Sequence, residues 1–247
     1  MQITKLAPYS DEDNNTIQYN ATSTPPVNIN FKGKNNRLII HGDAEISKLV
    51  ISFDCDDGYC EIGKGHFKGT IRIGQSCKVI IGDGVTCTSE CYISSAEFTE
   101  VKIGSDVMIA SQVEIRADDA HPIFDVTTKK RINLPRPISI GNHVWIGAFA
   151  KVLGGTTIGN GSVIGLGSIV KRKIPNNCIA TGVPAKVTRK NIAWERPHLT
   201  LAKPYFKPDA DSIKTGNYWN LTEEDIPAEI QDTPQDQAAT SQAIGTF

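Results

Sequence analysis

The sequence lacks the marks of several large classes of protein. Its 247 residues carry a formal net charge of -1 and contain no stripe of lysine and arginine, which argues against nucleic acid as the main partner. No apolar run approaches the length of a membrane span, and the segment from Met1 to Lys5 lacks the apolar core of a signal peptide. We therefore expect a cytoplasmic protein with no membrane span.

Cysteines are few and are not spaced for metal binding. Of the six, Cys55 and Cys60 have no matching pair at a zinc-site spacing, so no metal is expected. Reduced in the cytoplasm, Cys77, Cys87 and Cys91 fit small buried positions. The five histidines lack the three-histidine arrangement of γ-type carbonic anhydrases, which makes a metal-dependent enzyme of that kind a less favoured alternative.

The sequence does contain a period of six. From Ile140 to Val170 an apolar residue recurs at every sixth place, with a small or branched residue four places after it. This period fits neither a helix nor a plain strand. It fits a prism in which each hexad is one flat side, a short strand and a turn, with coils stacked about 4.8 Å apart. The in-phase positions are Ile140, Ile146, Val152, Ile158, Ile164 and Val170.

The repeat begins well before Ile140 and defines the domain organisation. Looser copies extend back to about residue 37, so we predict a mainly β fold, a parallel β-helix over 37–187. Residues 1–36 are expected to cap the open end of the coil. Residues 188–230, which mix prolines, acidic residues and aromatics, are predicted to form a C-terminal arm, and 231–247 a disordered tail.

One long interruption carries the first candidate catalytic residue. Ile115 and Ile140 lie twenty-five residues apart, which predicts an excursion loop over 116–137. His121 stands in this loop, away from the core, and could act as a general base for a hydroxyl group. The plainer interpretation is a surface histidine in a polar loop. The groups that could orient its imidazole are Asp119, Asp125, Glu114 and a backbone carbonyl.

Two further groups of residues point to ligands. Trp145 takes an outward-facing hexad position, which predicts either a ligand wall or a subunit contact, and His143 is predicted to point outward as a turn or interface residue. In the excursion loop Lys129, Lys130, Arg131 and Arg136 place four positive charges near His121. They favour a polyanionic acceptor, although a solvated loop would look similar.

The order of motifs resembles the hexapeptide-repeat O-acetyltransferases, which include galactoside, maltose, nodulation and capsule-modifying enzymes. The resemblance covers about residues 100–190. It is carried by His121-Pro122, the stretch from Ile140 to Gly147, the unbroken hexads, and Gly182-Val183-Pro184-Ala185-Lys186. Within the family, the loop and the tail are most similar to capsule-modifying polysialic acid O-acetyltransferases of the meningococcal type. The resemblance implies a left-handed β-helix, a homotrimer with active sites between subunits, and acetyl-CoA as the donor.

The resemblance also implies roles for individual residues. His121 would be the base, Trp145 would line the site, and the backbone N–H of Ala148 would stabilise the oxyanion. Ser94, Ser95 and Glu97 replace the upstream residues with which family members grip neutral sugars, which puts a galactoside-like acceptor in doubt. The implied cofactor-binding residues are Trp145, Gly147, Ala148, Gly165, Gly167, Arg172, Pro184, Lys186 and Arg189.

The expected function is acetyl-CoA-dependent O-acetylation of a cell-surface glycan. The favoured acceptor is the sialic acid residues of a capsular polysaccharide. A neutral capsule or lipopolysaccharide sugar is the alternative acceptor. An inert scaffold that kept the fold is a less favoured alternative, because a fold alone does not establish activity.

Overall fold

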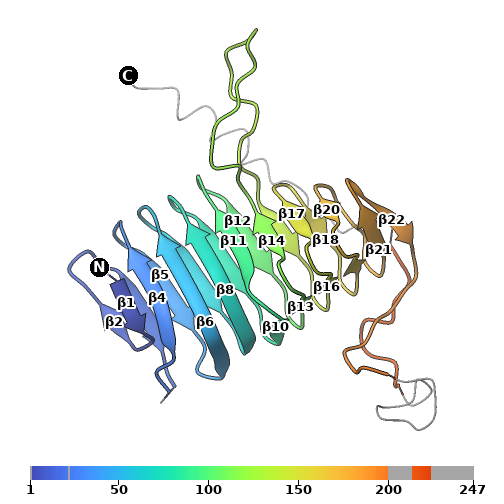
Figure 1. Cartoon of the computed structure of the whole chain (residues 1–247), viewed down its shortest axis with the longest axis horizontal. Coiled ribbons are helices and arrows are strands. Elements are labelled where there is room, and N and C mark those ends of the chain that lie inside the picture. Colours follow the sequence, from blue (N-terminus) through green and yellow to red (C-terminus); the bar gives the residue numbers. More distant parts are fainter. Residues whose placement is uncertain (1, 22, 200–212, 224–247) are drawn as a thin grey trace.

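The computed structural model describes residues 2–21, 23–199 and 213–223, and Figure 1 shows a three-sided coil built from short strands. Each coil runs through a first, a second and a third face, and successive coils pair in parallel. The parallel β-helix predicted from the period of six is confirmed. No helix in the described ranges could cross a membrane.

The strands divide among the three faces. The first face contains β2 (Tyr9–Ser10), β3 (Thr16–Tyr19), β5 (Arg37–Ile40), β7 (Tyr59–Ile62), β9 (Lys78–Ile81), β12 (Glu100–Ile103), β15 (Ile138–Ile140) and β18 (Thr157–Ile158). The second face contains the beginnings of β6 (Ala44–Phe53) and β8 (Gly65–Ile73), then β10 (Val85–Cys87), β13 (Met108–Ile109), β16 (Trp145–Ile146), β19 (Val163–Ile164), β21 (Ile179–Gly182) and β22 (Ala185–Arg189). The third face contains β1 (Gln2–Lys5), β4 (Pro26–Phe31), the ends of β6 and β8, β11 (Cys91–Ser95), β14 (Glu114–Arg116), β17 (Lys151–Leu153) and β20 (Ile169–Val170).

Each face stacks its inward apolar residues in register. On the second face Ile109 pairs with Ile146, which pairs with Ile164, and all three are 0% exposed. The other two faces have equivalent columns, and the predicted buried cysteines Cys77, Cys87 and Cys91 line the same core. The inward apolar residue of each hexad therefore adds to one continuous apolar core, which lengthens with every coil.

This packing predicts a large stability loss at one inward position. Ile146→Ala should lower the free energy of unfolding by about 2–5 kcal/mol, because a fully buried side chain is lost between two rigid neighbouring coils. Lys102→Ala, at an exposed outward position of β12, should change it by less than about 0.5 kcal/mol. Urea unfolding followed by circular dichroism measures both. Equal losses for the two variants would contradict the proposed column.

The coil begins earlier than the predicted boundary at residue 37. β3 pairs in parallel with β5, and β4 pairs in parallel with β6, so these strands lie within the predicted flank 1–36 and belong to the first coil. The cap is formed by β1 and β2, which pair antiparallel to β4 and β3. The flank looked polar because its strands alternate, with Ile17, Tyr19, Ile29 and Phe31 buried and polar residues between them.

Two interruptions of the repeat leave the coil where the spacing predicts. Residues 117–137 project from the corner between the third and first faces, as the long loop between β14 and β15 in Figure 1. The excess residues between Ile93 and Ile103 form a turn with positive φ at Glu97 and Phe98. At the other end, residues 190–199 and 213–223 pack on the coil. The rest of the predicted arm and the tail 231–247 lie outside the described residues.

Candidate active site

The turns between the second and third faces stack into one ridge, which we call the Ala148 corner. It consists of Ser111-Gln112, Ala148-Phe149, Leu166-Gly167 and Gly182 to Pro184 in successive coils. Backbone hydrogen bonds join the first three, from Phe149 N–H to the Ser111 carbonyl and from Gly167 N–H to the Ala148 carbonyl. The family-implied donor Ala148 and the implied cofactor residues Gly167 and Pro184 therefore share one edge of the prism.

Ala148 offers a hydrogen-bond donor at this corner. It precedes Phe149, whose φ is 62°, and Ala150 N–H closes the turn on the Gly147 carbonyl at 3.3 Å. Within the described part of the chain, no carbonyl accepts the N–H of Ala148. A backbone N–H held in a tight turn without a partner is a preorganised donor for an oxyanion.

The glycines near Ala148 occupy their positions for two different physical reasons. A Cβ on Gly147 would lie 2.7 Å from the Ile164 carbonyl oxygen, and a Cβ on Gly165 would lie 2.6 Å from Cγ2 of Thr181. Contact between coils therefore requires these two glycines, whatever ligand is bound. Gly167 has nothing within 4 Å of the corresponding position and a φ of +67°, so it alone of the three leaves open space beside the coil.

Trp145 lies beside the Ala148 corner on the second face. Its side chain points out of the coil and is 38% exposed, which confirms the predicted outward position. The Trp194 ring supports the Trp145 ring: their centroids lie 5.9 Å apart and their planes are tilted by 48°. Trp194 belongs to the C-terminal segment, whose contact with the site could not be located from the spacing of the repeat.

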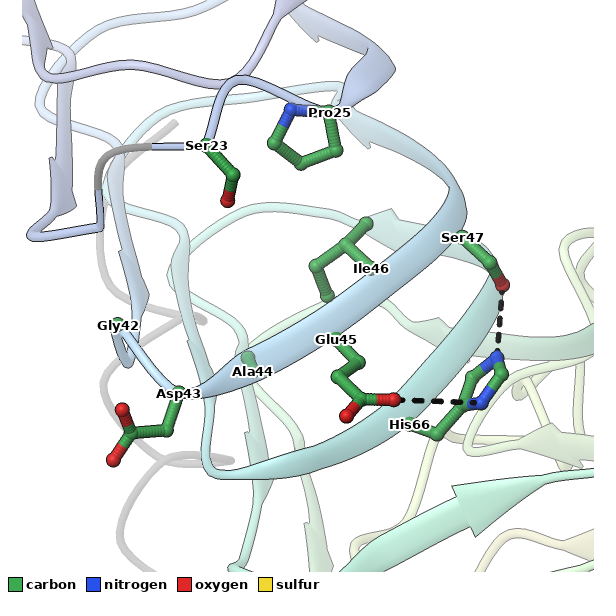
Figure 2. Close-up of a pocket in the computed structure, with 9 residues that line it drawn as sticks. All are labelled: Ser23, Pro25, Gly42, Asp43, Ala44, Glu45, Ile46, Ser47 and His66. Atoms are coloured by element: carbon green, nitrogen blue, oxygen red, sulfur yellow. Dashed lines mark hydrogen bonds and ion pairs between the residues drawn. The ribbon is translucent and has the colours of Figure 1, made fainter.

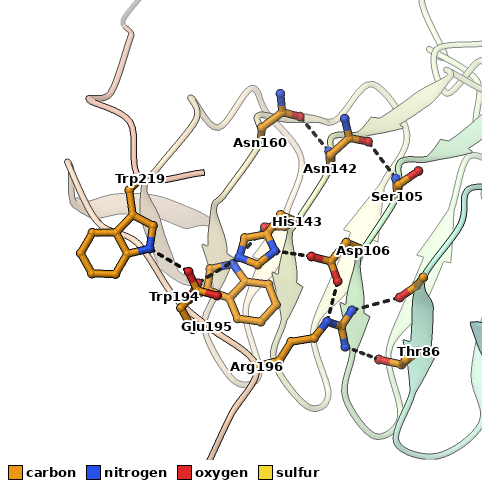
Figure 3. Close-up of polar contacts among 11 residues, drawn as sticks. Thr86, Ser105, Asp106, Asn142, His143, Asn160, Trp194, Glu195, Arg196 and Trp219 are labelled. Atoms are coloured by element: carbon orange, nitrogen blue, oxygen red, sulfur yellow. Dashed lines mark hydrogen bonds and ion pairs between the residues drawn. The ribbon is translucent and has the colours of Figure 1, made fainter. Parts of the chain in front are cut away.

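His143 points out of the coil as predicted, but the C-terminal segment covers it and leaves it 5% exposed. Its two nitrogens face Asp106 and the Trp194 carbonyl (Figure 3). Its ring also stacks on Trp194 and on Tyr218. Arg196 also contacts Asp106. The sequence signal that could have located this cluster was the density of aromatic residues after residue 188.

His121 lies in the exposed excursion loop, close to its base. Asn133 ties the two legs of the loop together: its amide donates to the His121 carbonyl at 2.9 Å and to Asp119 Oδ2 at 3.0 Å. Its carbonyl oxygen accepts from Ile123 N–H at 2.7 Å. Asp118, which is 7% exposed, anchors the start of the loop by accepting from Ser94 Oγ. Asn133 therefore fixes the backbone that carries His121, a role that the sequence did not reveal.

The acidic groups proposed to orient His121 have other partners. Asp119 accepts from Asn133, while Asp125 accepts from the backbone of its own turn, and the Thr128 N–H holds the pKa of this carboxyl below its ordinary value. Glu114 lies on the coil, where the Lys151 ammonium bonded to it lowers its pKa. Among the described residues no side chain hydrogen-bonds the His121 imidazole.

The four basic residues of the loop do not form a single free cluster. Arg131 is bound to Glu97 in the turn between β11 and β12, with Nη1 2.5 Å from Oε2. Arg136 lies over Gly155 at the base of the loop, with its Cδ 3.2 Å from the position of an added Cβ. Lys129 and Lys130 are exposed at the far end. Only these two lysines therefore remain as an exposed basic pair at the tip.

The implied phosphate-binding residues lie at the C-terminal end of the coil. Lys186 and Arg189 are exposed on β22, Arg172 is exposed after β20, and Pro184 is exposed in the turn that precedes β22. No ion pair within the described ranges involves any of the three basic side chains. A cationic end beyond the Ala148 corner suits a ligand with phosphate groups.

A cleft of about 620 Å³ lies elsewhere, near the N-terminal coils (Figure 2). His66 lies on its rim, 3.1 Å from Ser47 Oγ and 3.9 Å from Glu45. Its lining includes none of the predicted site residues. Among the described residues, no group of three or more histidine, cysteine or acidic side chains could hold a metal ion.

His121 and Ala148 lie at different corners of the same chain. The loop leaves at the corner between the third and first faces, whereas Ala148 lies between the second and third faces, with β17 between them. The intervening strand separates the two corners by roughly 15 Å, and the loop projects away from the coil (Figure 1). One chain by itself therefore does not bring the two groups together.

Comparisons with known proteins agree with this fold and site. Residues 137–172 match the family described as bacterial transferase hexapeptide (six repeats). The chain is 43% identical over 139 residues to the polysialic acid O-acetyltransferase of Escherichia coli O1:K1, covering 56% of this chain and 45% of that protein. It is 35% identical over 177 residues to the polysialic acid O-acetyltransferase of Neisseria meningitidis, covering 70% of this chain and 73% of that one.

A solved structure supports the same grouping. The polySia-specific acetyltransferase NeuO superposes with a TM-score of 0.71 at 39% identity, over 74% of this chain and 78% of that one. The chain therefore belongs to the hexapeptide-repeat acetyltransferases. Its similarity includes the polysialic acid O-acetyltransferases of that family. The chain spans about half the length of the Escherichia coli relative, 45%.

Proposed function

We propose that this protein is an acetyl-CoA-dependent O-acetyltransferase that acts on hydroxyl groups of a polyanionic glycan, with polysialic acid as its acceptor. The observation that carries the proposal is the free N–H of Ala148 beside the exposed Trp145, in a chain of this family. The proposal retains the cytoplasmic location expected from the sequence.

The residues support direct transfer. The His121 imidazole takes the proton of the acceptor hydroxyl as that oxygen attacks the thioester carbonyl carbon. The resulting oxyanion accepts a hydrogen bond from Ala148 N–H. The intermediate then collapses: the C–S bond breaks, His121 returns its proton to the departing sulfur, and the products are the O-acetyl ester and CoA. Trp145 forms the wall beside the reacting carbonyl.

The active site in this proposal lies between neighbouring copies of the chain in a homotrimer. His121 and Ala148 are at separate corners, so the loop of one copy would meet the Ala148 corner of the next. Both surfaces carry apolar side chains that a partner would cover. They are Ile123, Phe124, Val126, Ile132 and Leu134 on the loop, and Phe149, Leu166 and Val183 at the corner.

The cofactor in this proposal lies along the Ala148 corner. Gly167 leaves space for the pantetheine arm, and Leu166 and Val183 provide an apolar border beside it. The exposed Lys186 and Arg189 at the end of the coil would receive the phosphate groups. The thioester would then lie between Trp145 and the Ala148 N–H.

Acetyl-CoA-dependent CoA release, measured over a panel of acceptors, tests the proposed function. The panel contains polysialic acids, free sialic acid, neutral disaccharides, serine and chloramphenicol. Polysialic acids alone should raise turnover above the rate of hydrolysis. Equal turnover of neutral sugars would overturn the polyanionic acceptor and retain acetyl transfer. Absence of turnover together with absence of acetyl-CoA binding would favour an inert scaffold.

The basic tip of the loop predicts a salt dependence. Raising the salt concentration from about 0.05 to 0.5 M should raise the acceptor KM much more than the acetyl-CoA KM, because exposed lysines attract a polyanion through screened charges. A Lys129→Ala, Lys130→Ala double variant should weaken the acceptor and flatten this dependence. The matched control is Lys78→Ala, Lys102→Ala on the first face. Equal salt effects on both substrates would contradict the role of the tip.

A further inference from the structure

The C-terminal segment is held by a histidine whose two ring nitrogens both face oxygen atoms that can only accept. His143 Nδ1 lies 2.5 Å from Asp106 Oδ2, and Nε2 lies 2.9 Å from the carbonyl oxygen of Trp194. One ring therefore bridges the coil, through Asp106, and the C-terminal segment, through Trp194.

Two aromatic rings stack on this histidine. The Trp194 ring lies 4.2 Å away at 15°, and the Tyr218 ring lies 4.7 Å away at 4°. The histidine is 5% exposed, so its ring nitrogens need protein partners, which Asp106 and the Trp194 carbonyl supply. Removal of the ring would therefore break both polar contacts and both stacking contacts.

The other charged and titratable groups around this imidazole come from the coil and from the segment itself (Figure 3). Asp106 precedes β13, and its second oxygen accepts from Arg196 Nε at 2.5 Å. Arg196 Nη1 donates to Thr86 Oγ1 at 2.8 Å, which directs part of its charge away from the ring. Glu195 accepts from the Trp219 indole, and Tyr218 contributes its ring. Asp106 therefore contacts both Arg196 and His143.

The docked segment reaches the candidate active site through Trp194. The indole N–H of Trp194 donates to the His143 carbonyl at 2.9 Å, so the two residues exchange hydrogen bonds through their side chains and backbones. The same indole lies behind Trp145, at 5.9 Å. Release of Trp194 would leave Trp145 without this support on the exposed second face.

We infer that His143 is a positioning residue: its hydrogen bonds and ring contacts latch the C-terminal segment onto the coil and thereby hold Trp194 beside Trp145. The inference rests on the proposed function only where it concerns acetyl-CoA, whose site Trp145 lines.

The test compares His143→Gln with His41→Gln, the same substitution at an exposed histidine on the first face. Glutamine lacks the ring that stacks on Trp194 and Tyr218, and its single amide cannot span both oxygens as the two ring nitrogens do. Amide hydrogen exchange over 190–199 and 213–223, corrected for the intrinsic effect of pH, reports docking. Far-ultraviolet exciton circular dichroism reports the Trp145–Trp194 pair.

Exchange in the segment should be about tenfold faster in His143→Gln than in wild type, with a weaker exciton signal. Exchange in His41→Gln should follow wild type. The acetyl-CoA KM should rise several-fold in His143→Gln with kcat little changed, because only the wall of the site has loosened.

The inference would be overturned if wild type and His143→Gln showed equal exchange and equal exciton signals. If His143→Gln does not fold, Tyr218→Leu removes one aromatic face from the edge of the cluster, with Tyr218→Phe as its control. Faster exchange in Tyr218→Leu alone is expected, and no difference between the two would contradict the latch. If no acceptor is acetylated, the proposed function is overturned. The exchange and exciton results would still test whether His143 holds the C-terminal segment on the coil.

Discussion

His121→Ala is expected to lower kcat for acetyl transfer by roughly 10²- to 10⁴-fold, the usual contribution of a positioned general base. The imidazole lies on an exposed loop, where the described residues give it no hydrogen-bond partner, so its removal costs little stability. The acetyl-CoA KM should change by less than about twofold, because the donor is bound at the Ala148 corner. Steady-state CoA release with polysialic acid measures both constants.

The control for this result is His66→Ala, an exposed histidine on the second face that lies in the N-terminal cleft. Its activity should equal that of wild type. A second control, Asn133→Ala, tests the support of the base: it removes the bonds to His121 and Asp119 and should lower kcat less than His121→Ala does. Retention of full activity by His121→Ala would remove the proposed base from the mechanism.

Ala148→Pro is expected to lower kcat by about 10²- to 10³-fold, because proline has no N–H to donate to the oxyanion. The turn should tolerate the change. Phe149 has a φ of 62° and Ala150 N–H closes on the Gly147 carbonyl, which places residue 148 where proline is favoured in turns with positive φ at the next residue. The urea midpoint and kcat, measured on the same preparation, separate the two effects.

Ser111→Pro is the matched control for this substitution. Ser111 occupies the equivalent turn one coil earlier, followed by Gln112 with a φ of 59°. A proline there should change stability by a similar amount and leave kcat near wild type. If both prolines reduce kcat equally, the loss comes from distortion of the corner, and the oxyanion role of Ala148 is refuted.

The sequence predicted the repeated part of the fold because each hexad places an apolar residue at the same inward position of a coil. Ile103, Ile140 and Ile158 stack in one column, and their spacing in the chain is the length of a coil plus its insertions. The excursion loop was predicted for the same reason, as a break in that period. The exposed position of Trp145 followed from its place in the hexad.

The remaining features depend on contacts between distant segments, for which the period carries no information. His143 was predicted to point outward, which holds for its hexad position, but its burial depends on Trp194, fifty-one residues later. Arg131 looked free in a basic stretch, yet Glu97 of the preceding coil binds it. The sequence did not reveal the early start of the coil, because β3 and β4 alternate buried and more exposed residues but lack the glycines that mark later hexads.

The measurement that tests the account most directly is complementation between two inactive variants. His121→Ala and Ala148→Pro are unfolded together, refolded at equal amounts, and assayed for acetyl-CoA-dependent CoA release with polysialic acid. If each site combines the loop of one copy with the corner of the next, random assembly leaves about a quarter of the sites intact. The mixture should therefore regain about a quarter of the wild-type rate, whereas separately refolded variants stay inactive. Mixed oligomers that show no activity, although wild type refolds fully active, would contradict a site shared between copies.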